Sequence, residues 1–414
     1  MKLKLSYIPI SLFILCVVSS NISLKIVALI FFLVMFPTQI KVKFNHSIPF
    51  FYITLVIITI VFSLPFLLRE NYIIGLTISL ANLFISLFSF LIIYSYVNSS
   101  SNDKNKLIID SVFYFIVSYT FIQYVNIVLQ FGTINIYSIS AATGDFLTSI
   151  FSSSSVNMIV MSFYLLYYGF NKELKKASCS VAVILLTGYM SGIVLMIGAI
   201  GIWYFTTIKL TRLHFLMGFG AIAVILLFPL LSEGNYYYVL NYFKQAISSK
   251  PPYKIISYYE TFKYWTSSLQ TFIFGAGSIN FSSRTAFVVS GDYVSWFPDS
   301  YKYISETFSK NHFGIWTHDF MNPYNNRNNM ANQPFSFYNR IIGEFGVIGL
   351  IAYLLTYFNF LFKHAFQDSL IKLMFIFFSL ILLTDYWFEY LSVVIIFELL
   401  LLARIRTNIT KKYA

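Results

Sequence analysis

Apolar segments about as long as a lipid bilayer is thick recur along the whole chain. A helix needs roughly 20 apolar residues to cross the hydrocarbon core, within a range of about 17–25. Runs of this kind occupy residues 6–20, 22–40, 48–67, 72–97, 107–131, 156–170, 179–206, 215–231, 337–361, 371–385 and 389–405. They predict an all-α, polytopic transmembrane protein.

The composition excludes an ordinary water-soluble domain. Of the 414 residues, 58% are hydrophobic and 11% are charged, whereas globular domains are about 45–50% apolar and about 25% charged. The two cysteines, Cys16 and Cys179, form no disulfide framework or metal-binding pattern. Zinc, phosphate-loop and dinucleotide motifs are also absent from the sequence, so we expect no metal and no cofactor.

Positive charge is distributed unevenly among the loops. Lys and Arg collect in short cytoplasmic loops of membrane proteins, so we attribute the net charge of +12 to topology rather than to nucleic-acid binding. We place the N-terminus in the cytoplasm and divide 179–206 into two short spans near Gly188–Gly192. The cytoplasmic segments then hold 17 Lys and Arg, and the short outer loops hold only Lys25 and Arg69. This bias predicts about twelve spans with both termini in the cytoplasm.

The spans divide the chain into three regions. Residues 1–231 hold about nine spans, 232–336 form one large periplasmic loop, and 337–414 hold about three spans and a cytoplasmic tail. The loop is too rich in aromatic residues to read as disordered. Its segment YKIISYYETFKYWTSSLQTF places six apolar residues on one helical face: Ile255, Ile256, Tyr259, Phe262, Trp265 and Leu269. We therefore expect a small helical cap that packs on the outer membrane surface.

Charge also marks the return from this loop into the membrane. The stretch ANQPFSFYNRIIGEFGVIGLIAYLL places Arg340 and Glu344 four residues apart, on one helical face. A charge within a membrane segment is a functional-site hypothesis by default, although an ion pair at the water boundary would cost little. Gly343, Gly346 and Gly349 follow at three-residue spacing, and we expect them to allow close helix packing.

Four further residues are candidates for binding or catalysis. Arg284 follows FGAGSINFSS, whose glycines would let a ligand approach the backbone, and Arg pairs well with phosphate oxygens. Arg327 lies in the amide-rich segment YNNRNNMANQ. His318, which precedes Asp319, could act as a general base, and Arg69 is a minor candidate for the same anion. The alternative for each is a solvated loop charge.

The outer segments also hold acidic and aromatic side chains. Asp385 and Glu389, in TDYWFEY, lie at the turn between the last two spans, and we interpret them as solvated turn charges. Trp265, Trp296 and Trp316 lie in the large loop. They belong either to an aromatic belt at the membrane interface or to a surface that stacks on sugar rings, and the sequence does not separate these two interpretations.

The layout and the stretch around Arg340 resemble the O-antigen polymerase (Wzy) family, within the O-antigen ligase and polymerase superfamily of bacterial inner membranes. Members share many spans, a large periplasmic loop and a following helix with Gly-x-x-Gly, here Gly346 and Gly349. FIFGAGS is similar to the family's Phe–Gly turn. Phe335 and Ser336 stand where the ligase branch carries its histidine, and TGYMSGIV lacks the arginine that members often carry in mid-chain.

The resemblance implies a glycosyltransferase of the inner membrane that polymerises lipopolysaccharide O-antigen without a cofactor. A growing glycan would leave one undecaprenyl pyrophosphate carrier and join an acceptor unit on another carrier at the periplasmic face. The bilayer and a chain-length regulator protein are further expected partners, and nucleic acid is not. Glu344 or His318 would be the base, or Glu344 would orient Arg340. The candidate pyrophosphate ligands are Arg284, Arg340, Arg327 and Arg69.

Two alternatives remain from the sequence. A lipid-linked oligosaccharide flippase would also have many spans and a basic balance, but the chain shows no two-half internal repeat, and the large outer loop has no place in a flippase cycle. An O-antigen ligase would need the missing histidine.

Overall fold

Helices make up all of the regular structure in the parts of the chain that the structure describes. The computed structural model describes residues 7–35, 47–136, 146–207, 251–291, 297–315 and 336–413, with isolated positions between 212 and 248. The candidates His318 and Arg327 and most of the predicted span 215–231 lie outside these residues.

Among the residues that the structure describes, four helical stretches are long and apolar enough to cross a membrane. They are Ser47–Phe66 (α3, Ser47–Ser63, with the short helix η2, Leu64–Phe66), Tyr72–Ser99 (α4), Asn102–Phe131 (α5) and Phe337–Ala365. The last of them comprises α16 (Phe337–Tyr353), η7 (Leu354–Phe358) and α17 (Asn359–Ala365). In its described parts the chain is thus all-helical and of membrane type, as predicted from its apolar runs.

Other helices of the described residues are apolar but shorter: α1 (Ile8–Val18), α2 (Ile22–Met35), α8 (Met190–Phe205) and α18 (Ser369–Thr384). Two further helices, α6 (Ser154–Phe170) and α7 (Leu174–Thr187), have 17 and 14 residues. The apolar run 179–206 divides where its glycines predicted, because Gly188 ends α7 in the left-handed conformation, with φ 62°. The count of about twelve spans stays a prediction.

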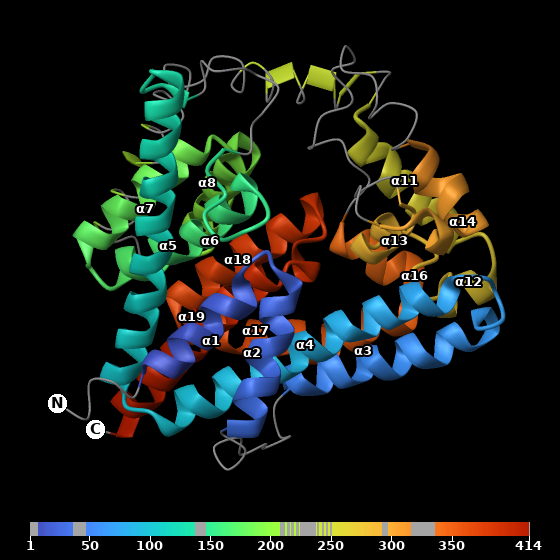
Figure 1. The fold of residues 1–414 in the computed structure, drawn as a ribbon, viewed down its shortest axis with the longest axis horizontal. Coiled ribbons are helices and arrows are strands. Elements are labelled where there is room, and N and C mark those ends of the chain that lie inside the picture. The colour runs from blue at the N-terminus through green and yellow to red at the C-terminus, as the bar shows by residue number, and fades with distance from the viewer. Residues whose placement is uncertain are drawn as a thin grey trace.

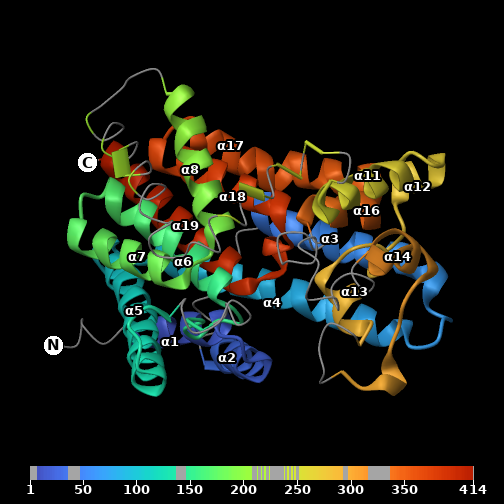
Figure 2. The ribbon, with the colours of Figure 1, turned by 90° about the horizontal axis from the view of Figure 1, so that it is seen from above.

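Segments rich in Lys and Arg meet at one end of the molecule (Figures 1 and 2). Lys106, at the start of α5, pairs with Glu173 before α7 at 2.8 Å. Arg404 of α19 (Leu391–Tyr413) pairs with Asp368 at 2.8 Å, and Asp368 caps α18 through the backbone N–H groups of Leu370 and Ile371. The charge bias predicted that these loops and the tail lie on the same side of the membrane. In the structure they contact one another at one end of the bundle.

The centre of the bundle is built from α6, α18 and α19. Phe378 and Phe397 stack with ring centroids 4.2 Å apart, and Phe163 packs on both. Glu398 is buried nearby and accepts hydrogen bonds from the hydroxyls of Tyr52 and Tyr357 at 3.0 and 3.1 Å. A buried carboxyl group needs such partners, and no motif in the sequence pointed to this residue.

Short helices form a cap at the opposite end, on α16 and α4 (Figure 1). They are α11 (Tyr253–Trp265), α12 (Leu269–Phe274), α13 (Arg284–Val289), η4 (Asp299–Tyr301), α14 (Glu306–Phe308) and η5 (Ser309–Phe313). The segment predicted as one helix is two, because Ser268 starts α12 with a capping box. The apolar face predicted for this segment is largely exposed, and polar residues of α11 pack inward instead.

Candidate functional site

The start of α16 is held by hydrogen bonds from three directions. Ser336 caps the helix by accepting from the backbone N–H groups of Tyr338 and Asn339 at 3.1 and 3.4 Å. The Tyr258 hydroxyl of α11 lies 2.6 Å from the Ser336 hydroxyl. The N–H of Phe337 donates to the Asp385 carbonyl at 3.2 Å. This last bond brings the turn after α18 beside the first residues of α16.

The glycines of α16 pack against the FGAGS turn (residues 274–278) rather than against another long helix. The N–H groups of Ala276 and Gly277 donate to the carbonyls of Gly343 and Glu344 at 2.8 and 2.9 Å. These carbonyls are available because Gly346 leaves the helical conformation, with φ 58° and ψ −152°. A Cβ on Gly346 would lie 2.5 Å from the Ile273 carbonyl oxygen. The two glycine motifs noted in the sequence therefore contact each other.

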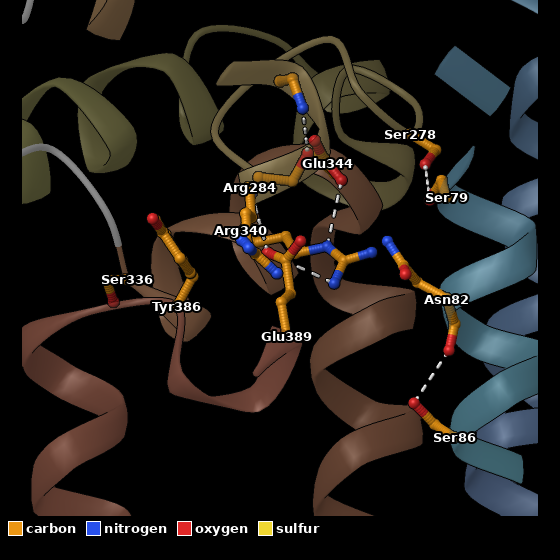
Figure 3. Close-up of polar contacts among 12 residues, drawn as sticks. Ser79, Asn82, Ser86, Ser278, Arg284, Ser336, Arg340, Glu344, Tyr386 and Glu389 are labelled. Atoms are coloured by element: carbon orange, nitrogen blue, oxygen red, sulfur yellow. Dashed lines mark hydrogen bonds and ion pairs between the residues drawn. The ribbon is translucent and has the colours of Figure 1, made fainter. Parts of the chain in front are cut away.

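Arg340 is enclosed between two carboxylates (Figure 3). Its Nε lies 3.4 Å from Glu344 Oε2, and its Nη1 lies 3.4 Å from Glu389 Oε1. The side chains of Arg340 and Glu389 are each 6% exposed, and that of Glu344 is 0% exposed. Charges taken out of water need such partners, since an uncompensated buried charge costs several kcal/mol (roughly 3–5). Arg340 and Glu344 therefore form an ion pair that the protein itself shields from its surroundings.

Arg284 reaches the same carboxylate from the cap. Ser283 caps α13 by accepting from the N–H of Ala286, and this places the backbone N–H of Arg284 3.1 Å from Glu389 Oε1. The Arg284 guanidinium lies over the Tyr390 ring, 4.6 Å from its centroid. Arg284 and Arg340 thus meet at one oxygen atom of Glu389, although they come from the cap and from the membrane helix.

A small pocket adjoins Arg340 and Glu389. Its volume is about 20 Å³, which is room for about one water molecule. The lining residues are Ser79, Asn82, Leu83, Ser86, Thr285, Arg340, Phe388 and Glu389. Figure 3 shows Ser79, Asn82 and Ser86 following one another along α4. Polar residues at this helical spacing within an apolar span are the signal that could have identified this face from the sequence.

The turn charges before α19 differ from the sequence interpretation. Glu389 was expected to be a solvated turn charge, but its side chain is buried, forms an ion pair with Arg340 and accepts a hydrogen bond from the Arg284 backbone N–H. The Asp385 carboxylate is partly buried and accepts from the N–H of Tyr386 at 2.7 Å. The expectation failed because the cap folds over this turn and removes its water.

The remaining predicted residues lie apart from this cluster or are not described. Arg69 is exposed, with its guanidinium 4.7 Å from the centroid of the Phe66 ring, and it does not line the pocket. His318 and Arg327 lie outside the described residues. Glu344 also does not line the pocket.

A second cluster of buried polar side chains, which includes Lys254 and His312, lies where α11 packs on α16 and η5. Burial lowers the pKa of Lys254, and the carboxylate of Asp385 opposes that shift. Burial also lowers the pKa of His312 to about 4, and the Lys254 charge adds to this, while a bond to the Ser257 carbonyl at 3.0 Å opposes it. His312 is enclosed by protein, so it cannot replace His318 as a base that touches substrate.

The chain matches no protein-family model, no curated protein and no solved structure. Among the described residues, no group of three or more His, Cys, Asp or Glu side chains is arranged to hold a metal ion. The site is therefore interpreted from its own geometry: two arginines, two buried carboxylates and a polar helix face at the cap end of the bundle.

Proposed function

We propose that this protein is an O-antigen polymerase of the bacterial inner membrane. It joins oligosaccharide repeat units carried on undecaprenyl pyrophosphate, at the periplasmic face. The observation that supports this most directly is the meeting of the Arg340 guanidinium and the Arg284 backbone N–H at Glu389, with the Arg284 guanidinium over the neighbouring Tyr390 ring, beside a polar pocket and at the end opposite the basic loops. Fixed cations at this place suit a pyrophosphate leaving group.

The resting site is neutral and closed, so donor binding has to rearrange it. Arg340 is compensated by Glu344 and Glu389, and the adjoining pocket is far smaller than a pyrophosphate. We propose that pyrophosphate oxygens replace the Glu389 carboxylate at the Arg340 guanidinium and at the backbone N–H of Arg284. Glu344 stays in place and positions Arg340, because it is fully enclosed.

The released Glu389 carboxylate then acts as the general base, in place of Glu344 or His318. The acceptor hydroxyl oxygen bonds to the anomeric carbon of the donor glycan, and the bond from that carbon to the pyrophosphate oxygen breaks. The hydroxyl proton passes to Glu389, and undecaprenyl pyrophosphate leaves with the bonding electron pair. The polar face of α4, with Ser79, Asn82 and Ser86, supplies hydrogen bonds to sugar hydroxyls.

Replacing Arg340 tests the assignment. Arg340→Ala removes a cation from the developing negative charge, which costs about 10²–10³-fold in rate for a comparable contact. We expect cells that carry this variant to lose long O-antigen ladders on gels while the protein still inserts in the membrane. The matched control is Arg404→Ala, since Arg404 also forms an ion pair but lies at the other end of the bundle. Full-length ladders from Arg340→Ala would remove Arg340 from the mechanism.

Deletion of the gene separates this function from its alternatives. A cell without its polymerase still places a single repeat unit on the lipid core, because transport and ligation continue. A cell without its flippase or its ligase places none. A core that lacks even the single unit would therefore refute the polymerase.

A further inference from the structure

Helix α11 turns its apolar side chains outward and its polar side chains inward. Tyr259 is 65% exposed and Phe262 is 61% exposed. On the opposite face, the buried Ser257 hydroxyl accepts from Asn339 Nδ2 of α16 at 3.1 Å, and the buried Thr261 hydroxyl lies 3.3 Å from His312 Nε2. A helix between a protein core and water shows the reverse arrangement. The exposed face of α11 is therefore not built for water.

Helix α12 continues the same exposed face. Leu269 is 76% exposed, and Phe272 and Phe274 are also exposed. Trp265, at the end of α11, stacks on Phe272 with ring centroids 4.8 Å apart, and its Nε1 donates to the Phe272 carbonyl at 2.9 Å. This contact holds the two short helices together, so their apolar side chains form one surface.

The position of α12 along the spans shows what this surface meets. Its last turn leads into Gly275, Ala276 and Gly277, which contact Gly343 and Glu344. These two residues lie in the second and third turns of the 29-residue apolar stretch Phe337–Ala365. The helix pair therefore lies beside the membrane helix rather than beyond its end.

A second contact places α12 against another span. The Phe274 ring packs edge-on against Phe62 of the stretch Ser47–Phe66, with ring centroids 5.4 Å apart. The exposed face of α11 and α12 is thus continuous with the surface that the spans α3 and α16 present to lipid.

We propose that α11 and α12 form an interfacial helix pair immersed in the bilayer leaflet at which α16 begins. Their occupant is lipid: Tyr259, Phe262, Leu269 and Phe272 contact the acyl chains below the headgroups, as amphipathic interfacial helices do. Lys263, whose side chain is 66% exposed, lies at the edge of this face and reaches the headgroups. The proposal does not depend on the polymerase function, because it rests on burial and position alone.

Collision accessibility of spin labels tests this immersion. The full chain with Cys16→Ala and Cys179→Ala is labelled with a nitroxide at Tyr259→Cys, Phe262→Cys or Leu269→Cys and reconstituted in phospholipid nanodiscs. Matched controls are Asp299→Cys and Lys310→Cys, which are exposed positions of the same cap. We expect the ratio of oxygen to nickel-chelate collision rates to be several-fold higher at the three apolar positions than at the controls, because oxygen concentrates in lipid and the chelate stays in water.

Two results would overturn the proposal. Equal ratios at the apolar and control positions would place the face in water. Low collision rates with both reagents at residues 259, 262 and 269 would mean that another segment of the protein covers the face. Because all three side chains are exposed, their replacement leaves the packing of α11 on α16 unchanged.

Discussion

Glu389 is contacted from two elements that lie far apart in the chain. The guanidinium of Arg340 and the backbone N–H of Arg284 share its Oε1 atom. Glu344 compensates Arg340 from the other side but has no access to the pocket. The two carboxylates therefore differ in role at the scale of single residues, although both neutralise the same arginine.

This difference predicts unequal effects of two conservative substitutions. We expect Glu389→Gln to lower kcat by about 10²–10⁴-fold, the usual contribution of a general base, and to lower KM for the lipid-linked donor, because a neutral amide competes less with pyrophosphate for Arg340. Glu344→Gln keeps a hydrogen-bond acceptor for Arg340, so we expect it to raise KM and to lower kcat less. The measurement is turnover of a purified lipid-linked repeat unit. A fully active Glu389→Gln enzyme beside an inactive Glu344→Gln enzyme would reverse the two roles.

At the scale of elements, the site depends on the docking of the FGAGS turn on α16. Gly346 breaks the helix so that the carbonyls of Gly343 and Glu344 accept from the turn. Arg284 and α13 follow this turn in the chain, and α13 packs on α4. The glycine motif thus positions an arginine of the cap beside an arginine of the membrane helix.

Gly346→Ala should undock the turn. The added Cβ would lie 2.5 Å from the Ile273 carbonyl oxygen and 2.8 Å from the Gly275 nitrogen, at a φ that disfavours side chains. We expect a loss of stability above about 1 kcal/mol, seen as a lower Tm in detergent, together with a loss of polymer. The control is Gly201→Ala in α8, where a Cβ meets nothing within 4 Å. An unchanged Tm for Gly346→Ala would contradict the role of the glycine break.

At the scale of the whole molecule, the basic segments and the arginine site lie at opposite ends. The basic segments around Lys106 and Arg404 gather at one end, and the cap with the arginine site lies at the other (Figure 1). The positive-inside rule predicts that the basic end is cytoplasmic. The proposed reaction needs this orientation, because its substrates are presented at the periplasmic face.

Cysteine labelling in cells checks this orientation. In the variant without native cysteines, we expect Lys310→Cys in the cap to react with a membrane-impermeant maleimide when only the outer membrane is opened. Lys175→Cys, an exposed position at the basic end, should react only after the inner membrane is permeabilised. Labelling in the opposite order would place the site in the cytoplasm and exclude the periplasmic polymerase.

The sequence by itself determined the class of structure and pointed to several of the residues that meet. Apolar runs predicted a helical membrane protein, and Gly188 predicted the break between α7 and α8. Arg340 and Glu344 were candidates because a charge within a membrane segment is costly to keep, and Arg284 was one because it follows a glycine-containing stretch and arginine pairs well with phosphate. These features are local, since length, periodicity and composition along one segment are enough to produce them.

The tertiary structure alone decided which of these residues share a site. Glu389 was expected to be solvated, and only the folding of the cap over its turn buries it between Arg284 and Arg340. The apolar face of α11 was recognised from its spacing, but its outward direction depends on the polar partners that α16 and η5 offer on the other side. Burial and charge compensation are properties of contacts between distant segments, and no pattern within one segment contains them.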